Sequence, residues 1–286
     1  MNSQHRSSTF SEVITPNHRW FKFNLREVLR YRDLMMLFVR RDFVAQYKQT
    51  ILGPLWLIIQ PLLTTFVFYV VFSKIAKIST NGSDPFLFYL SGITLWNYFS
   101  DCLTKTSNTF VANAGIFGKV YFPRLVLPIS IILSNLIKLG VQILLLLSVI
   151  LLRWSFQGLT PEWNFYVFLF PLLILNLAIL GLGLGLIFSS VTTKYRDFAY
   201  VLTFATQLLM FATPILYPLN FAQGLLAEVI ALNPLTPIFE TFRFTLFSSS
   251  NFDVVGLLYA FGLSVFCLMI GITLFNKVER SFMDTV

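Results

Sequence analysis

Long apolar stretches follow one another along this chain, and the first begins abruptly. A charged segment ends at Lys48, and no charged residue occurs from Ile51 to Phe72. A helix needs about 20 mostly apolar residues to cross the hydrocarbon core of a bilayer. Five later stretches are also long and largely apolar. The pattern predicts six transmembrane helices, at about residues 51–72, 86–110, 125–152, 164–188, 199–217 and 254–275.

Composition excludes a soluble globular protein. Hydrophobic residues make up 56% of the 286 residues, charged residues only 12%, and the mean hydropathy is +0.73. This leaves too little polar surface to face water. Spanning structures are helical bundles or closed barrels, and unbroken apolar runs without alternation favour helices. The predicted fold class is therefore an all-α integral membrane protein.

The basic residues predict the orientation. An even number of spans places both ends of the chain on one side, and that side collects most of the 21 Lys and Arg residues. Because cytoplasmic loops carry an excess of Lys and Arg, both termini are expected in the cytoplasm. Residues 1–50 lack the features of a secretory signal. We expect them to form a cytoplasmic arm and a surface helix ahead of a membrane domain at 51–286.

The segment from about residue 30 to 49 has helical periodicity. Met36, Val39, Phe43 and Tyr47 recur at spacings of three and four, which predicts an amphipathic helix on the membrane surface. A soluble helix packed on a partner is the alternative.

Ionisable residues occur inside two predicted spans. Asp101 and Lys105 are four residues apart, which is the spacing of an ion pair on a helix. Lys138 lies on a polar stripe with Ser134 and Gln142. Charges at membrane depth are often functional, but Lys138 could equally pair with a carboxylate such as Asp101 and hold the bundle together. Both interpretations stay open.

Two glycine motifs do not form nucleotide sites. A phosphate-binding loop containing Gly118-Lys119 would need Gly and Ser or Thr where Asn113 and Val120 stand. The LGLGLGL run of the fourth span lacks a strand–turn–helix context and indicates helix packing. We expect no ATP-binding loop and no cofactor in this chain.

Metal and disulfide chemistry also find no support. Cys102 and Cys267 lie far apart in apolar stretches, and His5 and His18 stand in a polar tail without cysteines nearby.

The fifth span and the segment after it carry further candidates. Tyr200, Phe204, Gln207 and Phe211 share one helix face, which indicates either packing or the lining of a sugar passage. Residues 218–247 are interrupted by prolines, which predicts two short helices that dip into the membrane and return.

Several short motifs together resemble a known family, the membrane subunit of type-2 ABC exporters of lipid-linked polysaccharides. The order and spacing of the motifs match over about four-fifths of the chain. O-antigen exporters are favoured over the capsule and teichoic acid exporters of the same family. The matching motifs are Tyr31-Arg32-Asp33-Leu34, Arg41-Asp42, Tyr47-Lys48-Gln49, Leu52-Gly53-Pro54-Leu55-Trp56, Gln60-Pro61, Tyr195-Arg196-Asp197, Asn233-Pro234 and Phe242-Arg243.

The resemblance implies a homodimer with two separate ATPase subunits, which would hold the ATP and Mg, in a bacterial inner (plasma) membrane. Helix 30–49 would be the interface helix, and the link 111–124 and the segment 193–198 would couple to the ATPase. The implied coupling residues are Asn113, Gly115, Phe117, Lys119, Tyr121, Arg124, Lys194, Arg196 and Asp197.

The implied substrate is a glycan on a polyprenyl diphosphate. Arg40, Arg41 and Lys48 could attract its anionic head group, since basic residues near a membrane surface attract anionic lipids. The expected passage is lined by Trp56, Phe66, Tyr69, Tyr200, Phe204, Gln207 and Phe211, and the external gate contains Asn233, Glu240 and Arg243.

Other classes of membrane protein fit less well. An ion channel or secondary transporter would explain six spans and Lys138, but the sequence shows no inverted repeat. A membrane glycosyltransferase or protease would need clustered carboxylates, a metal motif, or a nucleophile with a base, and none is present.

Overall fold

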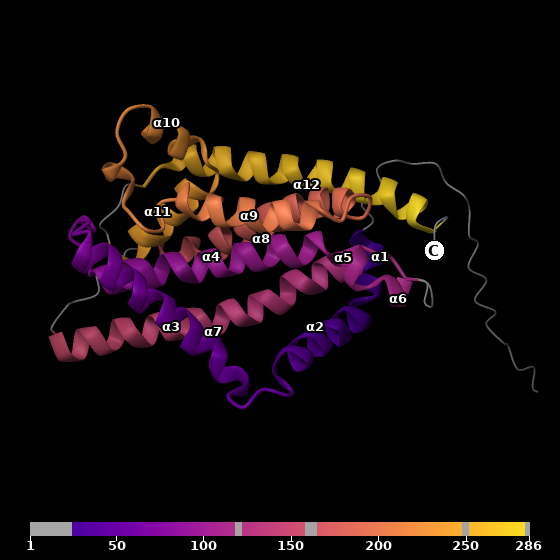
Figure 1. The fold of residues 1–286 in the computed structure, drawn as a ribbon, viewed down its shortest axis with the longest axis horizontal. Helices are drawn as coiled ribbons and strands as arrows, with labels where there is room; N and C mark the ends of the chain where they lie inside the picture. Colours follow the sequence, from indigo (N-terminus) through magenta and orange to yellow (C-terminus); the bar gives the residue numbers. More distant parts are fainter. Residues whose placement is uncertain (1–24, 118–121, 158–164, 248–251, 284–286) are drawn as a thin grey trace, which may run out of the picture.

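A computed structural model describes residues 25–117, 122–157, 165–247 and 252–283, and every long regular element in those ranges is helical. The helices form an elongated bundle (Figure 1). The α-helices are α1 (Leu25–Arg30), α2 (Arg32–Tyr47), α3 (Trp56–Phe68), α4 (Pro85–Ser107), α5 (Thr109–Ala112), α6 (Ala114–Phe117), α7 (Val126–Gln157), α8 (Phe170–Thr192), α9 (Phe198–Phe211), α10 (Leu225–Leu232), α11 (Leu235–Phe247) and α12 (Val254–Met283).

The predicted membrane class is confirmed. Four helical segments are long and apolar enough to cross a bilayer, and the pair α10 and α11 could form a fifth, bent span. The four segments are Gly53–Ile75, Val126–Phe156, Phe165–Thr192 and Val254–Val278. The first contains α3 and a π-helical turn, Tyr69–Ile75, which the sequence did not predict.

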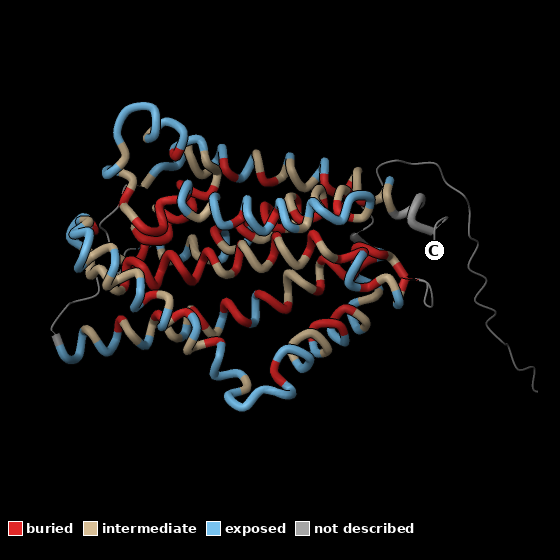
Figure 2. The backbone as a smooth tube through the Cα atoms, in the orientation of Figure 1, coloured by how far each residue is buried: buried red, intermediate tan, exposed pale blue. Residues whose placement is uncertain are grey.

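Helix α4 is less apolar than these four and occupies the centre of the bundle. Most of its residues are buried, and its tube in Figure 2 is mostly red. A helix of 23 residues is about 34 Å long, enough to cross the membrane. Its polar residues Ser91, Thr94, Thr106 and Ser107 are buried in protein, whereas the side chains of Asp101 and Lys105 are 40% exposed.

Helix α9 ends earlier than predicted. It has 14 residues, about 21 Å, whereas the predicted fifth span extended to residue 217. Pro214 lacks an amide hydrogen and disfavours helical backbone in the residue before it. The chain therefore leaves the helix after Phe211 and forms a buried turn at 213–216.

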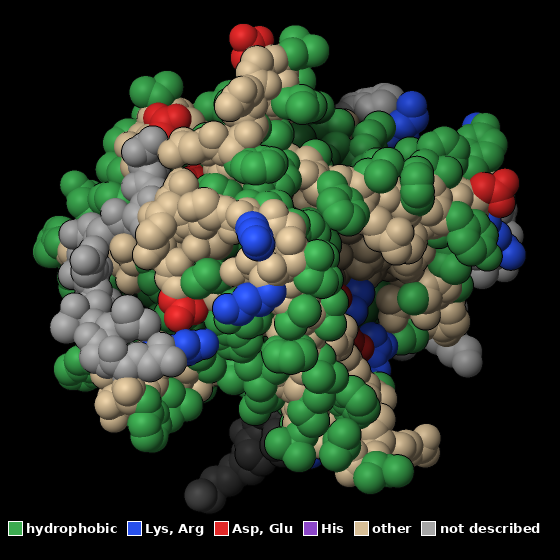
Figure 3. All heavy atoms as spheres, turned by 60° about the vertical axis from the view of Figure 1, so that its left-hand side comes forward, with side chains coloured by type: hydrophobic (Ala, Val, Ile, Leu, Met, Phe, Trp, Pro, Cys, Tyr) green, Lys and Arg blue, Asp and Glu red, His purple; other side chains and the backbone are tan. Residues whose placement is uncertain are grey.

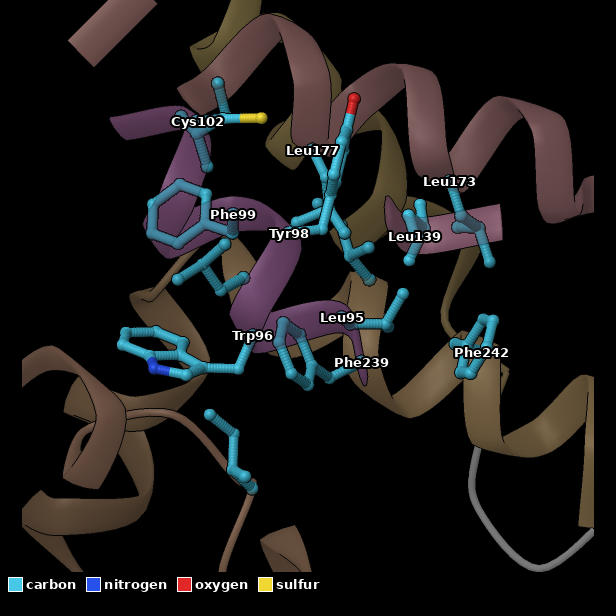
Figure 4. Packing of buried hydrophobic residues seen from close by; sticks show 14 of the residues in the cluster. Leu95, Trp96, Tyr98, Phe99, Cys102, Leu139, Leu173, Leu177, Phe239 and Phe242 are labelled. Atoms are coloured by element: carbon cyan, nitrogen blue, oxygen red, sulfur yellow. The ribbon is translucent and has the colours of Figure 1, made fainter. Parts of the chain in front are cut away.

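The core lies where α4, α7, α8 and α11 meet. Figure 4 shows Leu95, Phe99 and Cys102 among the packed side chains, all of which are buried. The rings of Phe170 and Phe242 stack with their centroids 4.7 Å apart.

The glycines of LGLGLGL allow helices to approach closely on two sides, which confirms the packing interpretation. A Cβ at Gly181 would lie 2.9 Å from Cys102 Cβ of α4. A Cβ at Gly183 would lie 2.6 Å from the Leu268 amide nitrogen of α12. Helix α8 is therefore held between α4 and α12.

The buried face of α2 differs from the predicted stripe. Met35, Phe38, Val39 and Tyr47 are buried, whereas Met36 is 65% exposed. Of the predicted stripe, Val39 and Tyr47 are buried in protein, Phe43 is half-buried and Met36 is exposed on the chain. The reason is that α2 packs on α7 and on Phe122, so contacts with protein select its buried face.

Hydrophobic side chains cover much of the face in Figure 3, with Lys, Arg, Asp and Glu in small groups. An apolar exterior of this kind suits contact with lipid or with another subunit.

We predict that Gly183→Ala destabilises the protein by about 1–3 kcal/mol, since the new methyl group would meet backbone atoms that cannot turn aside. Thermal unfolding of the purified protein in detergent measures this effect. Gly262→Ala is the matched control on α12, because no heavy atom lies within 4 Å of its Cβ position. Equal melting temperatures for the two variants would contradict the prediction.

Candidate functional site

A charged cluster connects α4 and α7. Asp101 Oδ2 lies 2.7 Å from Lys105 Nζ and 3.3 Å from Lys138 Nζ. Lys105 also donates to Asn135 Oδ1 at 3.2 Å. Both predicted pairings are present, and Lys138 is buried together with its polar stripe. Two cations therefore share one carboxylate at this position.

These lysines line a cavity of about 530 Å³ between α2, α4, the short helices α5 and α6, and α7. The cavity brings together residues predicted for three different roles: Arg41 for the head group, Asn113 for coupling, and the intramembrane lysines. Its polar lining consists of Arg41, Asp42, Gln46, Thr104, Lys105, Asn108, Asn113, Ser134, Asn135 and Lys138. Among the described residues, no group of three His, Cys, Asp or Glu side chains could hold a metal ion.

Arg41 connects α2 to the segment between α4 and α7. Its guanidinium donates to Asp42 Oδ1 at 2.9 and 2.7 Å, and to Asn113 Oδ1 at 3.3 Å. Asn113 in turn donates to the Thr109 carbonyl at 3.1 Å. Sequence reasoning missed this connection, because 72 residues separate Arg41 from Asn113. The other two basic residues predicted for the head group, Arg40 and Lys48, are exposed and do not line the cavity.

Tyr47 at the end of α2 is buried. Burial, and then the negative charge of Asp101, raise the pKa of Tyr47 to about 12, so its hydroxyl keeps its proton at neutral pH.

The predicted coupling residues lie in two segments, the link before α7 and the turn between α8 and α9. Phe117 and Arg124 are buried, with the Arg124 guanidinium carbon 5.0 Å from the centroid of the Phe117 ring, so these two side chains support the link from inside. Gly115 is exposed. Lys119 and Tyr121 lie outside the described residues. The exposed turn between α8 and α9 carries Lys194, Arg196 and Asp197.

The predicted passage residues lie on the outside of the chain. The side chain of Tyr200 is 80% exposed, and Phe204, Gln207 and Phe211 are exposed beside it on α9. In the first span, Trp56 and Phe66 are exposed and Tyr69 is half-buried. Both α3 and α9 pack on α4. A single chain therefore presents these residues without enclosing them.

Arg243 holds the bent helix pair against the bundle. It is only 1% exposed, and its guanidinium donates to the carbonyls of Pro214, Ile215 (3.0 Å) and Phe88 (3.5 Å). Glu240 lies 3.6 Å away, as the spacing of three predicted. The contacts with α4 and with the turn after α9 were not predicted.

Asn233 produces the bend between α10 and α11, which is 85°. Its side-chain nitrogen Nδ2 donates to the Ala212 carbonyl at 3.1 Å and to Thr213 Oγ1 at 3.0 Å. Its Oδ1 accepts from the Leu235 amide at 3.0 Å, as an N-cap side chain does. The predicted interruption at Asn233-Pro234 is confirmed.

A second cap and ion pair escaped the sequence interpretation. Asp84 accepts from the amides of Phe86 and Leu87 at the start of α4, and its other oxygen lies 3.3 Å from Arg153 of α7. The Asp-Pro pair at the helix start is a typical cap signal that could have revealed the first of these contacts.

Comparisons with known proteins find similarity to transporter proteins. A family model described as ABC-2 type transporter matches residues 33–247. An O-antigen export system permease protein from Klebsiella pneumoniae is 28% identical over 264 residues, which covers 92% of this chain and 97% of the relative. One from Myxococcus xanthus is 27% identical over 266 residues, covering 92% and 98%.

We predict that Arg243→Met lowers the free energy of unfolding by about 3–5 kcal/mol, because Glu240 loses the neighbouring positive charge and three buried carbonyls lose their donor. The double variant Arg243→Met/Glu240→Gln removes both charges and should recover part of the loss. Thermal unfolding of these two variants and of Glu240→Gln alone checks this. If the double variant is less stable than the single one by the full cost of Glu240→Gln alone, the two charges are not coupled.

Proposed function

This chain belongs to the ABC-2 type transporter family, and from that premise we propose that it is the membrane subunit of an ATP-driven exporter of O-antigen-like polysaccharide carried on polyprenyl diphosphate. The observation that supports this most directly is the similarity to O-antigen export permeases over 97% and 98% of their length. The similarity extends over all the helices that the structure describes between residues 33 and 247.

A permease of this family lacks an ATPase and depends on a partner for hydrolysis. We propose two copies of this chain with two ATPase subunits. The segment 111–124 and the exposed Lys194, Arg196 and Asp197 would contact the ATPases. Exposed charges suit a surface that is in water in the free subunit and is covered only when the partner binds. The excess of basic residues before the first span and in the links after the second and fourth spans supports a cytoplasmic position for both termini. The membrane would be the bacterial inner membrane.

The homodimer explains the exposed aromatic face of α9. Aromatic rings with polar tips, together with neutral amides, give a sugar polymer flat surfaces without fixing it by charge. Two chains that present Tyr200, Phe204, Gln207 and Phe211 to each other would enclose a passage that one chain leaves open. Trp56, Phe66 and Tyr69 would extend the same lining. Asn233, Glu240 and Arg243 would hold the external gate.

The exposed Arg40 and Lys48 would attract the diphosphate to α2, each with about 1 kcal/mol of surface attraction.

The central test uses the chain together with its ABC ATPase partner, reconstituted in liposomes. We expect ATP hydrolysis to rise when a lipid-linked glycan is added, and glycan to cross the membrane only with both subunits and ATP. Transport or ion conduction by this chain alone, without the ATPase, would contradict the proposal.

The passage is tested with the double variant Tyr200→Ala/Phe204→Ala. Stacking of an aromatic ring on a nucleic acid base contributes about 1–3 kcal/mol. Sugar–ring contacts of comparable area are lost in the double variant, and this loss should slow polymer export several-fold. Export rate per assembled complex is the measurement. Phe266→Ala is the control, since it removes an exposed ring from α12. Unchanged export in a fully assembled double variant would rule out this lining.

A further inference from the structure

The cavity between α2, α4 and α7 has a chemistry that a passage for neutral sugars does not require. Three cationic side chains, Arg41, Lys105 and Lys138, contribute to its lining. Of these, Lys138 stands on a span and is buried. Placing charge at membrane depth is costly, so a buried Lys138 with two further cations beside it points to a ligand or to a structural pairing.

Structural pairing accounts for only part of the charge. Arg41 is paired with Asp42. Lys105 and Lys138 both contact Asp101, at 2.7 and 3.3 Å, so that two positive charges are matched by one negative charge. Among the described residues of this cluster, three cationic side chains face two carboxylates, so one positive charge is in excess. A bound anion would neutralise it.

Hydrogen-bond donors are also in excess. Each ammonium has three N–H groups. Lys138 directs one to Asp101, and Lys105 directs one to Asp101 and one to Asn135. The polar side chains of Asn108, Asn113 and Ser134 line the same cavity. A phosphate group with several acceptor oxygens suits this arrangement better than a carboxylate does.

The cavity also has an apolar part, formed by Phe43, Ile116 and Ile131. Phosphate oxygens and hydrocarbon could therefore be accommodated side by side, as in a lipid whose tail begins at its phosphate.

We propose that this cavity is a binding site for the diphosphate head group of a prenyl lipid, with Lys105 and Lys138 contacting the phosphates and Arg41 at the side of α2. The identity of the lipid rests on the proposed function. The site lies within one chain, between helices of the same subunit, and is separate from the aromatic face of α9.

The test is a binding measurement on the purified complex of this chain and its ATPase in detergent, by microscale thermophoresis. The probes are a short-chain prenyl diphosphate, the corresponding prenyl alcohol, and inorganic diphosphate. We expect the prenyl diphosphate to bind the natural protein, and Lys138→Met to weaken binding about tenfold or more, as expected when a charged hydrogen-bond partner is removed.

Two variants provide the controls. Lys138→Arg keeps the charge and should bind within a few-fold of the natural protein. Lys277→Met removes an exposed cation of α12 that lies outside the cavity, and should not change binding. Lys138→Met leaves Asp101 paired with Lys105, so the variant should stay folded, and its melting temperature is measured on the same sample.

Binding that is unchanged in Lys138→Met, or a prenyl alcohol that binds as tightly as the diphosphate, would overturn the phosphate site. Inorganic diphosphate that binds as tightly as the lipid would overturn the assignment to a lipid head group. Failure of the proposed function is distinguishable: glycan transport would then be absent although the lysine-dependent binding of prenyl diphosphate is present. If the site alone is wrong, glycan transport proceeds at the natural rate in Lys138→Met.

Discussion

Inside hydrocarbon, each polar group needs a partner from the protein, because no water is available to supply one. Arg243 shows how far this requirement shapes the molecule. A single buried guanidinium reaches the carbonyls of Pro214, Ile215 and Phe88, so it joins α11 to the turn after α9 and to α4. The same requirement joins Lys138 to Asp101 between α7 and α4. Polar contacts therefore fix part of the arrangement, and close apolar packing fixes the rest, as between α4, α8 and α12.

Helix α4 receives most of these contacts. Its first turn is capped by Asp84 and accepts from Arg243 at the Phe88 carbonyl, and its last turns carry Asp101 and Lys105. It could be both polar and central because α7, α8 and α11 surround it with protein. The cavity beside its final turns connects the charged cluster to Arg41 and Asn113, and so brings the surface helix, the coupling link and the membrane core into one set of contacts.

Local spacing predicted much of this structure. The apolar runs gave most of the helices, a separation of four gave the pair Asp101 and Lys105, and Asn233-Pro234 gave the bend. Contacts between distant segments could not be read in the same way. The bond from Arg41 to Asn113 depends on how α2 folds back on the bundle, and the exposure of Met36 follows from packing on α7. The early end of α9 had a local signal in Pro214, but the apolar residues around it suggested a longer span.

The glycines of α8 have a mechanical consequence. With backbones as close as Gly183 and Leu268 are, α4, α8 and α12 cannot slide past one another without steric clashes, so they form a rigid plate. Helices α2, α3 and α9 lie at the margins of this plate, and of the bent pair α11 packs against it while α10 contacts α11. Any large rearrangement during a working cycle must therefore take place at the margins, while the central plate moves as one body.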